Sequence, residues 1–256
     1  MRILITNDDG ITSQGIKELA TSLTSIGKVY VIAPETEKSA CGHGITVHYP
    51  IKVTKFPLDE NIEAWSVTGT PADCVKLGIT TLLPQPPDMV VSGINNGANL
   101  GTDVLYSGTV SGAIEGIILG VPAMAVSIDS YTPGDYTLAK EVALKLCTKM
   151  LLEDLTPDTL INVNVPNTTP QEVKGIKVTR LGERKYTDNF EHRKDPRGND
   201  YYWLKGKAMP PSQKDEDFDV VAVYNNFISV TPIHFDLTNY KIIEQVRNWG
   251  IEGKGF

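Results

Sequence analysis

The first ten residues, Met1-Arg-Ile-Leu-Ile-Thr-Asn-Asp-Asp-Gly10, decide the fold of this chain. The apolar run Ile3-Leu4-Ile5 stops abruptly at Asn7-Asp8-Asp9-Gly10, as a buried parallel strand does when it leaves the core. Two adjacent carboxylates repel each other, and a hard divalent metal, which takes oxygen ligands, is the usual partner that compensates them. A structural alternative is that Asp-Gly forms a turn and Asp9 caps the next helix. These ten residues alone leave both interpretations open.

Length and composition restrict the class of protein. With 256 residues the chain can form one large α/β domain, or a domain with an appendage. A net charge of −7 argues against a nucleic-acid polymer as partner, because such a partner requires a basic face. The three cysteines contain no CxxC pair, so neither a disulfide framework nor a zinc site is indicated. No window approaches the ~20 apolar residues of a membrane span, and no apolar leader precedes the first strand, so we expect a cytoplasmic protein without membrane contact.

Apolar runs and amphipathic helices alternate up to residue 165. Buried strands are predicted at residues 3–5, 29–33, 89–91, 122–128 and 160–165, and helices at 16–26, 109–119 and 136–150. Thr70-Pro71-Ala72-Asp73 predicts a further helix start, with a cap, a proline at the first helical position and an acid in the first turn. Alternating β and α elements imply parallel strands with right-handed crossovers. We therefore expect a doubly wound, mostly parallel α/β sheet.

The character of the chain changes after Gly182. Residues 183–219 are charged and aromatic and lack a core-forming run, so they form either a surface excursion or a protruding hairpin arm that packs on another subunit. The second possibility predicts a homodimer, or a homotetramer built from dimers. Other predictions are an edge strand or hairpin at 45–56, a returning strand at 228–233 and a closing helix at 238–249. The chain thus divides into an α/β core (1–182), an arm (183–219) and a returning strand with a C-terminal helix (220–256).

Polar residues follow three of the predicted strands at their carboxyl ends, where open α/β sheets bind ligands. Asp8 and Asp9 follow the first strand, Ser39 lies in the loop after the second, and Asn95 follows the strand at 89–91. Their carboxylate, hydroxyl and amide oxygens form a hard ligand set, suited to Mg²⁺ or Mn²⁺ and poor for zinc. The four histidines lack metal-binding spacing, and we expect Asn99 and Asp103 to fix a loop.

The segment Tyr106-Ser-Gly-Thr-Val-Ser-Gly112 leads straight into a predicted helix. Backbone amides at a helix N-terminus, with the Ser107 and Thr109 hydroxyls, predict an anion site suited to phosphate, although an ordinary capped helix has the same pattern. No phosphate-binding G-x-x-x-x-G-K-S/T loop, dinucleotide G-x-G-x-x-G motif or G-x-S-x-G nucleophile elbow follows a strand. The Asp-x-Asp pattern of phosphatases that form a covalent aspartyl intermediate is also missing after the first strand.

Several segments together resemble the SurE family of stationary-phase-survival 5′-nucleotidases. They are ILITNDDG (3–10), GTPADCVK (69–76), VSGINNGANLG (91–101), YSGTVS (106–111) and SVTPIHFDLT (229–238). The resemblance implies a Rossmann-like α/β fold with a C-terminal extension exchanged between subunits. It also implies a phosphomonoesterase that hydrolyses nucleoside 5′-monophosphates or other small phosphate esters, with one divalent cation, Mg²⁺ or Mn²⁺, per subunit.

Carried over residue by residue, the resemblance implies specific roles. The metal ligands become Asp8, Asp9, Ser39 and Asn95, and the phosphate contacts become Asn96, Ser107, Gly108 and Thr109. Asp8 and Asp9 are also the catalytic candidates, one of them orienting a water that attacks without a covalent phosphoenzyme.

The loop around Ser39 departs from the family pattern. It carries Cys41 and His43, where many members have Ser followed directly by Gly, so its pocket edge is expected to differ. Two other functions stay open. One is a non-catalytic nucleotide-binding regulator, and the other is a Mg²⁺-dependent nucleotide-sugar transferase.

Overall fold

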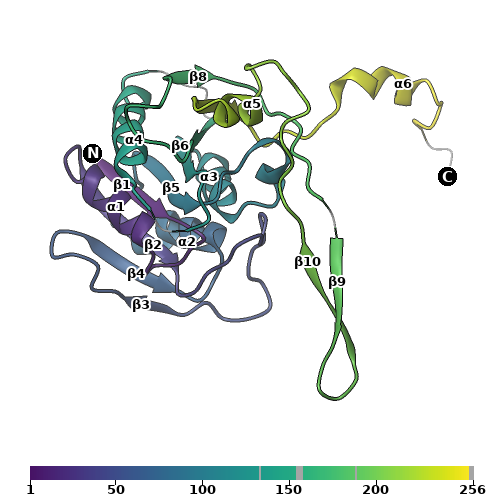
Figure 1. The fold of residues 1–256 in the computed structure, drawn as a ribbon. Coiled ribbons are helices and arrows are strands. Elements are labelled where there is room, and N and C mark those ends of the chain that lie inside the picture. Colours follow the sequence, from purple (N-terminus) through teal and green to yellow (C-terminus); the bar gives the residue numbers. More distant parts are fainter. Residues whose placement is uncertain (133, 154–157, 188, 254–256) are drawn as a thin grey trace.

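The computed structural model describes residues 1–132, 134–153, 158–187 and 189–253, and its centre is a nine-stranded mixed sheet (Figure 1). The strand order is β3-β4-β2-β1-β5-β6-β7-β11-β8, with β3 antiparallel to β4 and β11 antiparallel to β7. The strands are β1 (Arg2–Thr6), β2 (Lys28–Pro34), β3 (Val53–Lys55), β4 (Glu63–Val67), β5 (Met89–Asn96), β6 (Ala123–Ile128), β7 (Leu160–Val165), β8 (Ile176–Val178) and β11 (Ile228–Ile233).

Helices cover both faces of the sheet (Figure 1). Helices α1 (Gln14–Leu23) and α4 (Thr137–Met150) pack on one face, and α2 (Pro71–Leu77) and α3 (Gly108–Ile118) pack on the other. Ile3 and Ile5 of β1 belong to the core under α1 and α4, whereas Leu4 belongs to the core under α2 and α3. Burial on both faces explains why the central strands are continuous apolar runs and confirms the predicted α/β fold.

The strand order reverses between β1 and β5. From β1 the chain proceeds outward through β2 to β4, and from β5 it proceeds the other way through β6 to β7. The two strands pair in parallel, with Ile3 opposite Met89 and Thr6 opposite Ser92, so their carboxyl ends lie side by side. Such a reversal is where ligands bind in open α/β sheets.

Strand β5 is irregular just before its end. Its register against β6 shifts between Ser92 and Asn95, around Gly93, which has a φ of 137°. A Cβ on Gly93 would lie 2.2 Å from the carbonyl oxygen of Val126, so glycine is required there. An irregularity of this kind redirects the following side chains, which here are Asn95 and Asn96.

Some elements differ from the prediction. The predicted helices at 109–119 and 136–150 are confirmed with starts shifted by one residue, and the capped start at Thr70 is confirmed by a reciprocal capping box with Asp73. Residues 45–56 contain only the short β3. The predicted C-terminal helix is reduced to a 3-10 turn (Tyr240–Ile242) and α6 (Ile243–Arg247), neither of which has a buried residue to hold a longer helix against the body. Further short elements are two helical turns (Gly78–Leu82 and Gly101–Leu105) and α5 (Asp219–Tyr224).

A two-stranded hairpin projects away from the body (Figure 1). It consists of β9 (Asn189–Lys194) and β10 (Asp200–Lys205), paired antiparallel. Its side chains Phe190, Tyr202 and Trp203 are all more than 60% exposed. The hairpin has the form predicted for the arm, while its packing on another subunit stays a prediction. Within the described ranges, no helix has the length and apolar character needed to cross a membrane.

Candidate functional site at the β1–β5 switch point

Asp8 lies directly after β1 and is buried, with 4% exposure. The hydroxyl of Thr109, itself fully buried in the first turn of α3, donates a hydrogen bond to Asp8 Oδ1. The pKa of Asp8 is raised to about 6, mainly by burial and to a smaller extent by the charge of Asp9, while hydrogen bonds oppose the rise. The proton of the Thr109 hydroxyl is therefore directed at Asp8.

Asp9 turns toward the end of β5. Its Oδ2 accepts from the backbone amide of Asn96 at 3.1 Å and from Asn96 Nδ2 at 3.3 Å. Burial raises the pKa of Asp9, the Asn96 hydrogen bonds oppose this, and the charge of Glu37 adds to it. The adjacent Asn95 is buried and donates from Nδ2 to the carbonyl of Gly97 at 2.6 Å, which leaves its amide oxygen as the atom for a ligand.

The loop after β2 packs along these strand ends. The backbone amide of Lys38 donates to the carbonyl of Asp8 at 2.7 Å, and that of Gly42 donates to the carbonyl of Tyr106 at 3.0 Å. Ser39 therefore follows a residue that is tied to Asp8. Its hydroxyl is exposed and donates to Glu37 Oε1 at 2.7 Å.

The N-terminus of α3 closes the site on one side. Ser107 caps the helix, because its hydroxyl accepts from the amide of Val110 at 3.0 Å, and a hydroxyl that accepts can still donate its own proton. A Cβ on Gly108 would lie 2.8 Å from Asp8 Cβ and 3.0 Å from Cys41 Sγ. Glycine thus allows the helix end, with its partial positive charge, to approach the Asp8 carboxylate closely.

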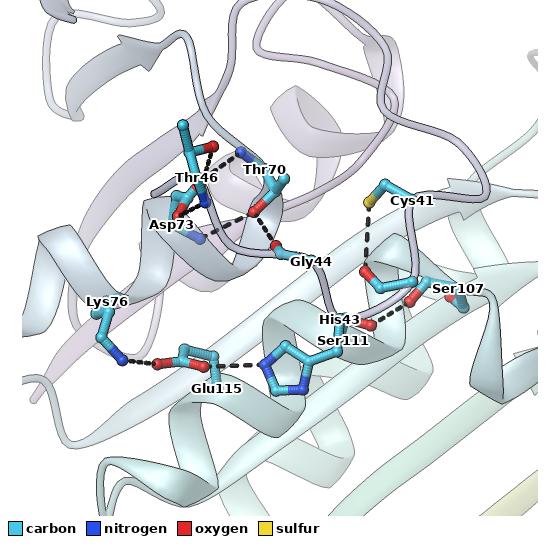
Figure 2. A network of polar contacts seen from close by, with 11 residues as sticks. Cys41, His43, Gly44, Thr46, Thr70, Asp73, Lys76, Ser107, Ser111 and Glu115 are labelled. Carbon is cyan, nitrogen blue, oxygen red and sulfur yellow. Dashed lines mark hydrogen bonds and ion pairs between the residues drawn. The ribbon is translucent and has the colours of Figure 1, made fainter. Parts of the chain in front are cut away.

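A second polar network fixes the loop that carries Ser39 (Figure 2). Glu115 of α3 is only 3% exposed. Its Oε1 accepts a hydrogen bond from Lys76 Nζ at 2.7 Å, and its Oε2 lies 2.9 Å from His43 Nε2. The hydrogen bond with His43 is the main cause that lowers the pKa of Glu115. Asp73 of α2 accepts from both the amide and the hydroxyl of Thr46. Residues 43–46 are thereby attached to α2 and α3.

Neighbouring loops are fixed as expected from the sequence. Asn99 accepts from Asn162 Nδ2 through its carbonyl at 2.9 Å and donates through its amide to Asn164 Oδ1 at 2.7 Å. Asp103 pairs with Arg184 Nε at 3.2 Å and accepts from the hydroxyl of Tyr186. Neither residue is part of the group formed by Asp8 and Asp9.

Sequence reasoning missed the partners that orient the predicted residues. Glu115 and Lys76 were not identified, although a lone acid among the apolar positions of a helix is a signal that can be read. Tyr136, whose hydroxyl donates to Asn96 Oδ1 at 2.8 Å, carries no sequence signal of this contact.

The donor set decides which cation suits the site. In the part of the chain that the structure describes, there is no group of three or more His, Cys, Asp or Glu side chains that could hold a metal. A cation at the switch point would therefore rely on Asp8, Asp9 and neutral oxygens such as those of Ser39 and Asn95. An oxygen-only set with two carboxylates fits Mg²⁺ or Mn²⁺.

Fold and site together define a doubly wound α/β protein with an acidic, oxygen-rich site beside a helix N-terminus at its topological switch point. Residues 3–188 match the family described as survival protein SurE. The 5′-nucleotidase SurE of Alkaliphilus metalliredigens is 53% identical over 254 residues, covering 98% of this chain and 100% of the relative, and that of Heliobacterium modesticaldum is 52% identical, covering 97% and 92%. The crystal structure of the SurE protein from Aquifex aeolicus has a TM-score of 0.84 and 42% identity, covering 98% of this chain and 100% of that one. This chain belongs to the SurE family.

Proposed function

We propose that this protein is a phosphatase that hydrolyses nucleoside 5′-monophosphates to nucleoside and phosphate with the help of a divalent cation. The observation that carries the proposal is the pair of adjacent carboxylates, the buried Asp8 and the half-buried Asp9, beside the N-terminus of α3. The substrate class is supported by relatives at about half identity that are named 5′-nucleotidase.

In this proposal Asp8, Asp9, Ser39 and Asn95 hold one Mg²⁺ or Mn²⁺ per subunit. When bound, such a cation supplies Lewis-acid activation of water and neutralises charge on the phosphate ester. Asp8 or Asp9 orients the attacking water. The water oxygen forms a bond to phosphorus in line with the ester oxygen, whose bond to phosphorus breaks and which leaves with a proton. Without a covalent phosphoenzyme, a single displacement completes the reaction.

The opposite side of the substrate phosphate is held by α3 and by β5. Gly108 and Thr109 contribute backbone amides and Ser107 its hydroxyl proton, so the helix N-terminus stabilises charge that develops on the phosphate oxygens. Asn96 contributes the second N–H of its side-chain amide. These groups lie close to the two carboxylates. Asn96 and Thr109 contact Asp9 and Asp8, and Ser107 caps the helix turn that contains Gly108 and Thr109.

The proposal includes the setting of the enzyme. We place it in the cytoplasm, in keeping with three free cysteines, Cys41, Cys74 and Cys147. The exposed aromatic hairpin is the surface through which it forms a homodimer, or a homotetramer of dimers.

The test is phosphate release from a panel of nucleoside monophosphates with Mg²⁺, with Mn²⁺ and with EDTA. We expect release that requires the metal and that falls in Asp9→Asn by more than the roughly 10–100-fold typical of outer-shell changes. Asp59→Asn, at an exposed carboxylate remote from the site, is the matched control.

Three results would contradict the proposal or part of it. Tight nucleotide binding without turnover would favour a regulator. Turnover only with a nucleotide sugar and an acceptor would favour a transferase. A trapped phosphoaspartate would overturn the single displacement.

A further inference from the structure

The side chain of Tyr136 is almost completely buried. It lies at the start of α4 and is only 3% exposed, within the core under α1 and α4. A Cβ on Gly15 of α1 would lie 3.5 Å from its ring, so the two helices hold the ring closely. The hydroxyl reaches the rim of the site and donates to Asn96 Oδ1 at 2.8 Å. A fixed phenol therefore ends on a residue that contacts Asp9.

Asp9 and Tyr136 together determine how the Asn96 amide is oriented. An ionised carboxylate has no proton, so the atom of Asn96 that faces Asp9 Oδ2 must be the donor Nδ2. The amide oxygen then faces Tyr136, which satisfies it by donating. The reversed orientation would place two acceptors, Asn96 Oδ1 and the Asp9 carboxylate, against each other. The Asp9 carboxylate thus excludes the reversed orientation, and the Tyr136 hydroxyl holds the amide oxygen in the remaining one.

This orientation has a consequence for the ligand. One N–H of Asn96 Nδ2 is directed to Asp9, and the amide plane fixes the direction of the second. Both hydrogen bonds from Asn96 go to Oδ2 of Asp9. Oδ1 of Asp9 is therefore the carboxylate oxygen that remains available for a cation.

We infer that Tyr136 is a positioning residue for the phosphate end of the site, whose hydroxyl locks the Asn96 amide so that its free N–H points at a bound phosphate group. The inference rests on the proposed function, since it assumes that phosphate binds next to Asn96. Tyr136 acts through Asn96 and does not touch the reacting atoms.

The variant Tyr136→Phe tests this, because it removes the hydroxyl and keeps the packed ring. The matched control is Tyr30→Phe, at a tyrosine of β2 that is 2% exposed and belongs to the other core. Inorganic phosphate is the probe, titrated calorimetrically into protein loaded with Mn²⁺, and the affinity for Mn²⁺ itself is measured in parallel. We expect phosphate affinity to fall about three- to tenfold in Tyr136→Phe, as for the loss of one hydrogen bond, with KM for a nucleotide rising by the same factor. Mn²⁺ affinity and the Tyr30→Phe protein are expected to stay within twofold of wild type.

A double-mutant cycle separates positioning from general damage. In an Asn96→Ala background, Tyr136→Phe should have no further effect on phosphate affinity. Unchanged phosphate binding in Tyr136→Phe, a full effect that persists without Asn96, or an equal loss of Mn²⁺ affinity would each overturn the inference. Wild-type protein that binds no phosphate with either metal would instead overturn the proposed function.

Discussion

Asp8 and Asp9 are adjacent in the chain, yet their side chains lie in different surroundings. Asp8 is buried under α3 with Thr109 as its donor, whereas Asp9 is half-buried and held by Asn96. The described side chains give neither carboxylate an ion pair within 4.0 Å. Two desolvated negative charges without a cation destabilise the fold locally, so the arrangement is costly without a ligand and favours binding one.

This imbalance predicts a pH-dependent stability in the metal-free protein. Burial raises the pKa of Asp8 from 3.8 to about 6, so the stability that protonated Asp8 contributes below pH 3.8 is lost as the pH rises through about 6. In EDTA we expect Asp8→Asn to be about 1–2 kcal/mol more stable than wild type at pH 7.5, and no more stable at pH 4. Urea denaturation at the two pH values measures this.

Added Mn²⁺ should reverse the order at pH 7.5, because it stabilises only the protein that binds it. If Asp8→Asn in EDTA is less stable than wild type at both pH values, the ionised Asp8 is stabilised by its hydrogen bonds more than burial destabilises it.

The loop after β2 shows how two helices position a segment that has no regular structure. It is attached through Thr46 to Asp73 of α2 and through His43 to Glu115 of α3 (Figure 2). Glu115 is buried while its partners His43 and Lys76 are partly exposed, so its charge depends on them for compensation. The network thus attaches residues 43–46 of this loop, which follow Ser39, to α2 and α3.

We expect Glu115→Gln to lower the free energy of unfolding by about 1–2 kcal/mol at pH 7, because buried hydrogen bonds to charged groups are lost. The pKa of Glu115 is lowered, so its contribution is present above its ordinary value of 4.5 and is lost as the pH falls through the lower folded value. The difference from wild type should therefore shrink in acid. Denaturation of Glu115→Gln at pH 7 and below pH 4 measures this, with the exposed Glu141→Gln of α4 as control. A difference that is the same at both pH values would show that packing, not charge, holds the loop.

The sequence was sufficient for the elements that are buried on both faces. Strands β1, β2, β5, β6 and β7 have continuous apolar runs because helices cover both of their sides. The strands β4 and β8 and the helix α5 were missed, since short elements have too few residues to show a period. The closing helix was overestimated, because its apolar residues do not pack on the body.

For the site, the strand ends could be predicted and their contacts could not. The rule that carboxyl ends of parallel strands share one edge predicted that Asp8, Asp9, Asn95 and Ser39 belong to one region. The donors to Asp8 and Asn96, which are Thr109 and Tyr136, are 101 and 40 residues away in the chain. Such pairs depend on how α3 and α4 pack on the sheet, which sequence periodicity does not specify.

The hairpin is attached firmly at its base and exposed at its tip. At the base, Arg184 pairs with Asp103, and Asp219 accepts from the amides of Gly101 and Gly182. These contacts join the arm to the loop that follows β5 and the site. Farther out, the β9–β10 pair has contacts mainly within itself, and its aromatic side chains are left to solvent or to a partner. Exposed aromatic surface on a rigid base is typical of an interface.

Removing the hairpin tests whether it holds subunits together. The amide of Thr187 already donates to the carbonyl of Lys207 at 3.0 Å, so a short Gly-Ser turn can replace residues 188–206 without straining the base. We expect wild type to elute as a dimer or tetramer, and the shortened protein to have the mass of a monomer by light scattering. The fold of each subunit should be kept because the removed side chains are exposed, while the unfolding midpoint loses the contribution of subunit association. The double variant Phe190→Ser/Trp203→Ser should weaken association, whereas Tyr49→Ser, also at an exposed aromatic, should not. Shortened protein that keeps the wild-type mass would place the interface elsewhere on the molecule.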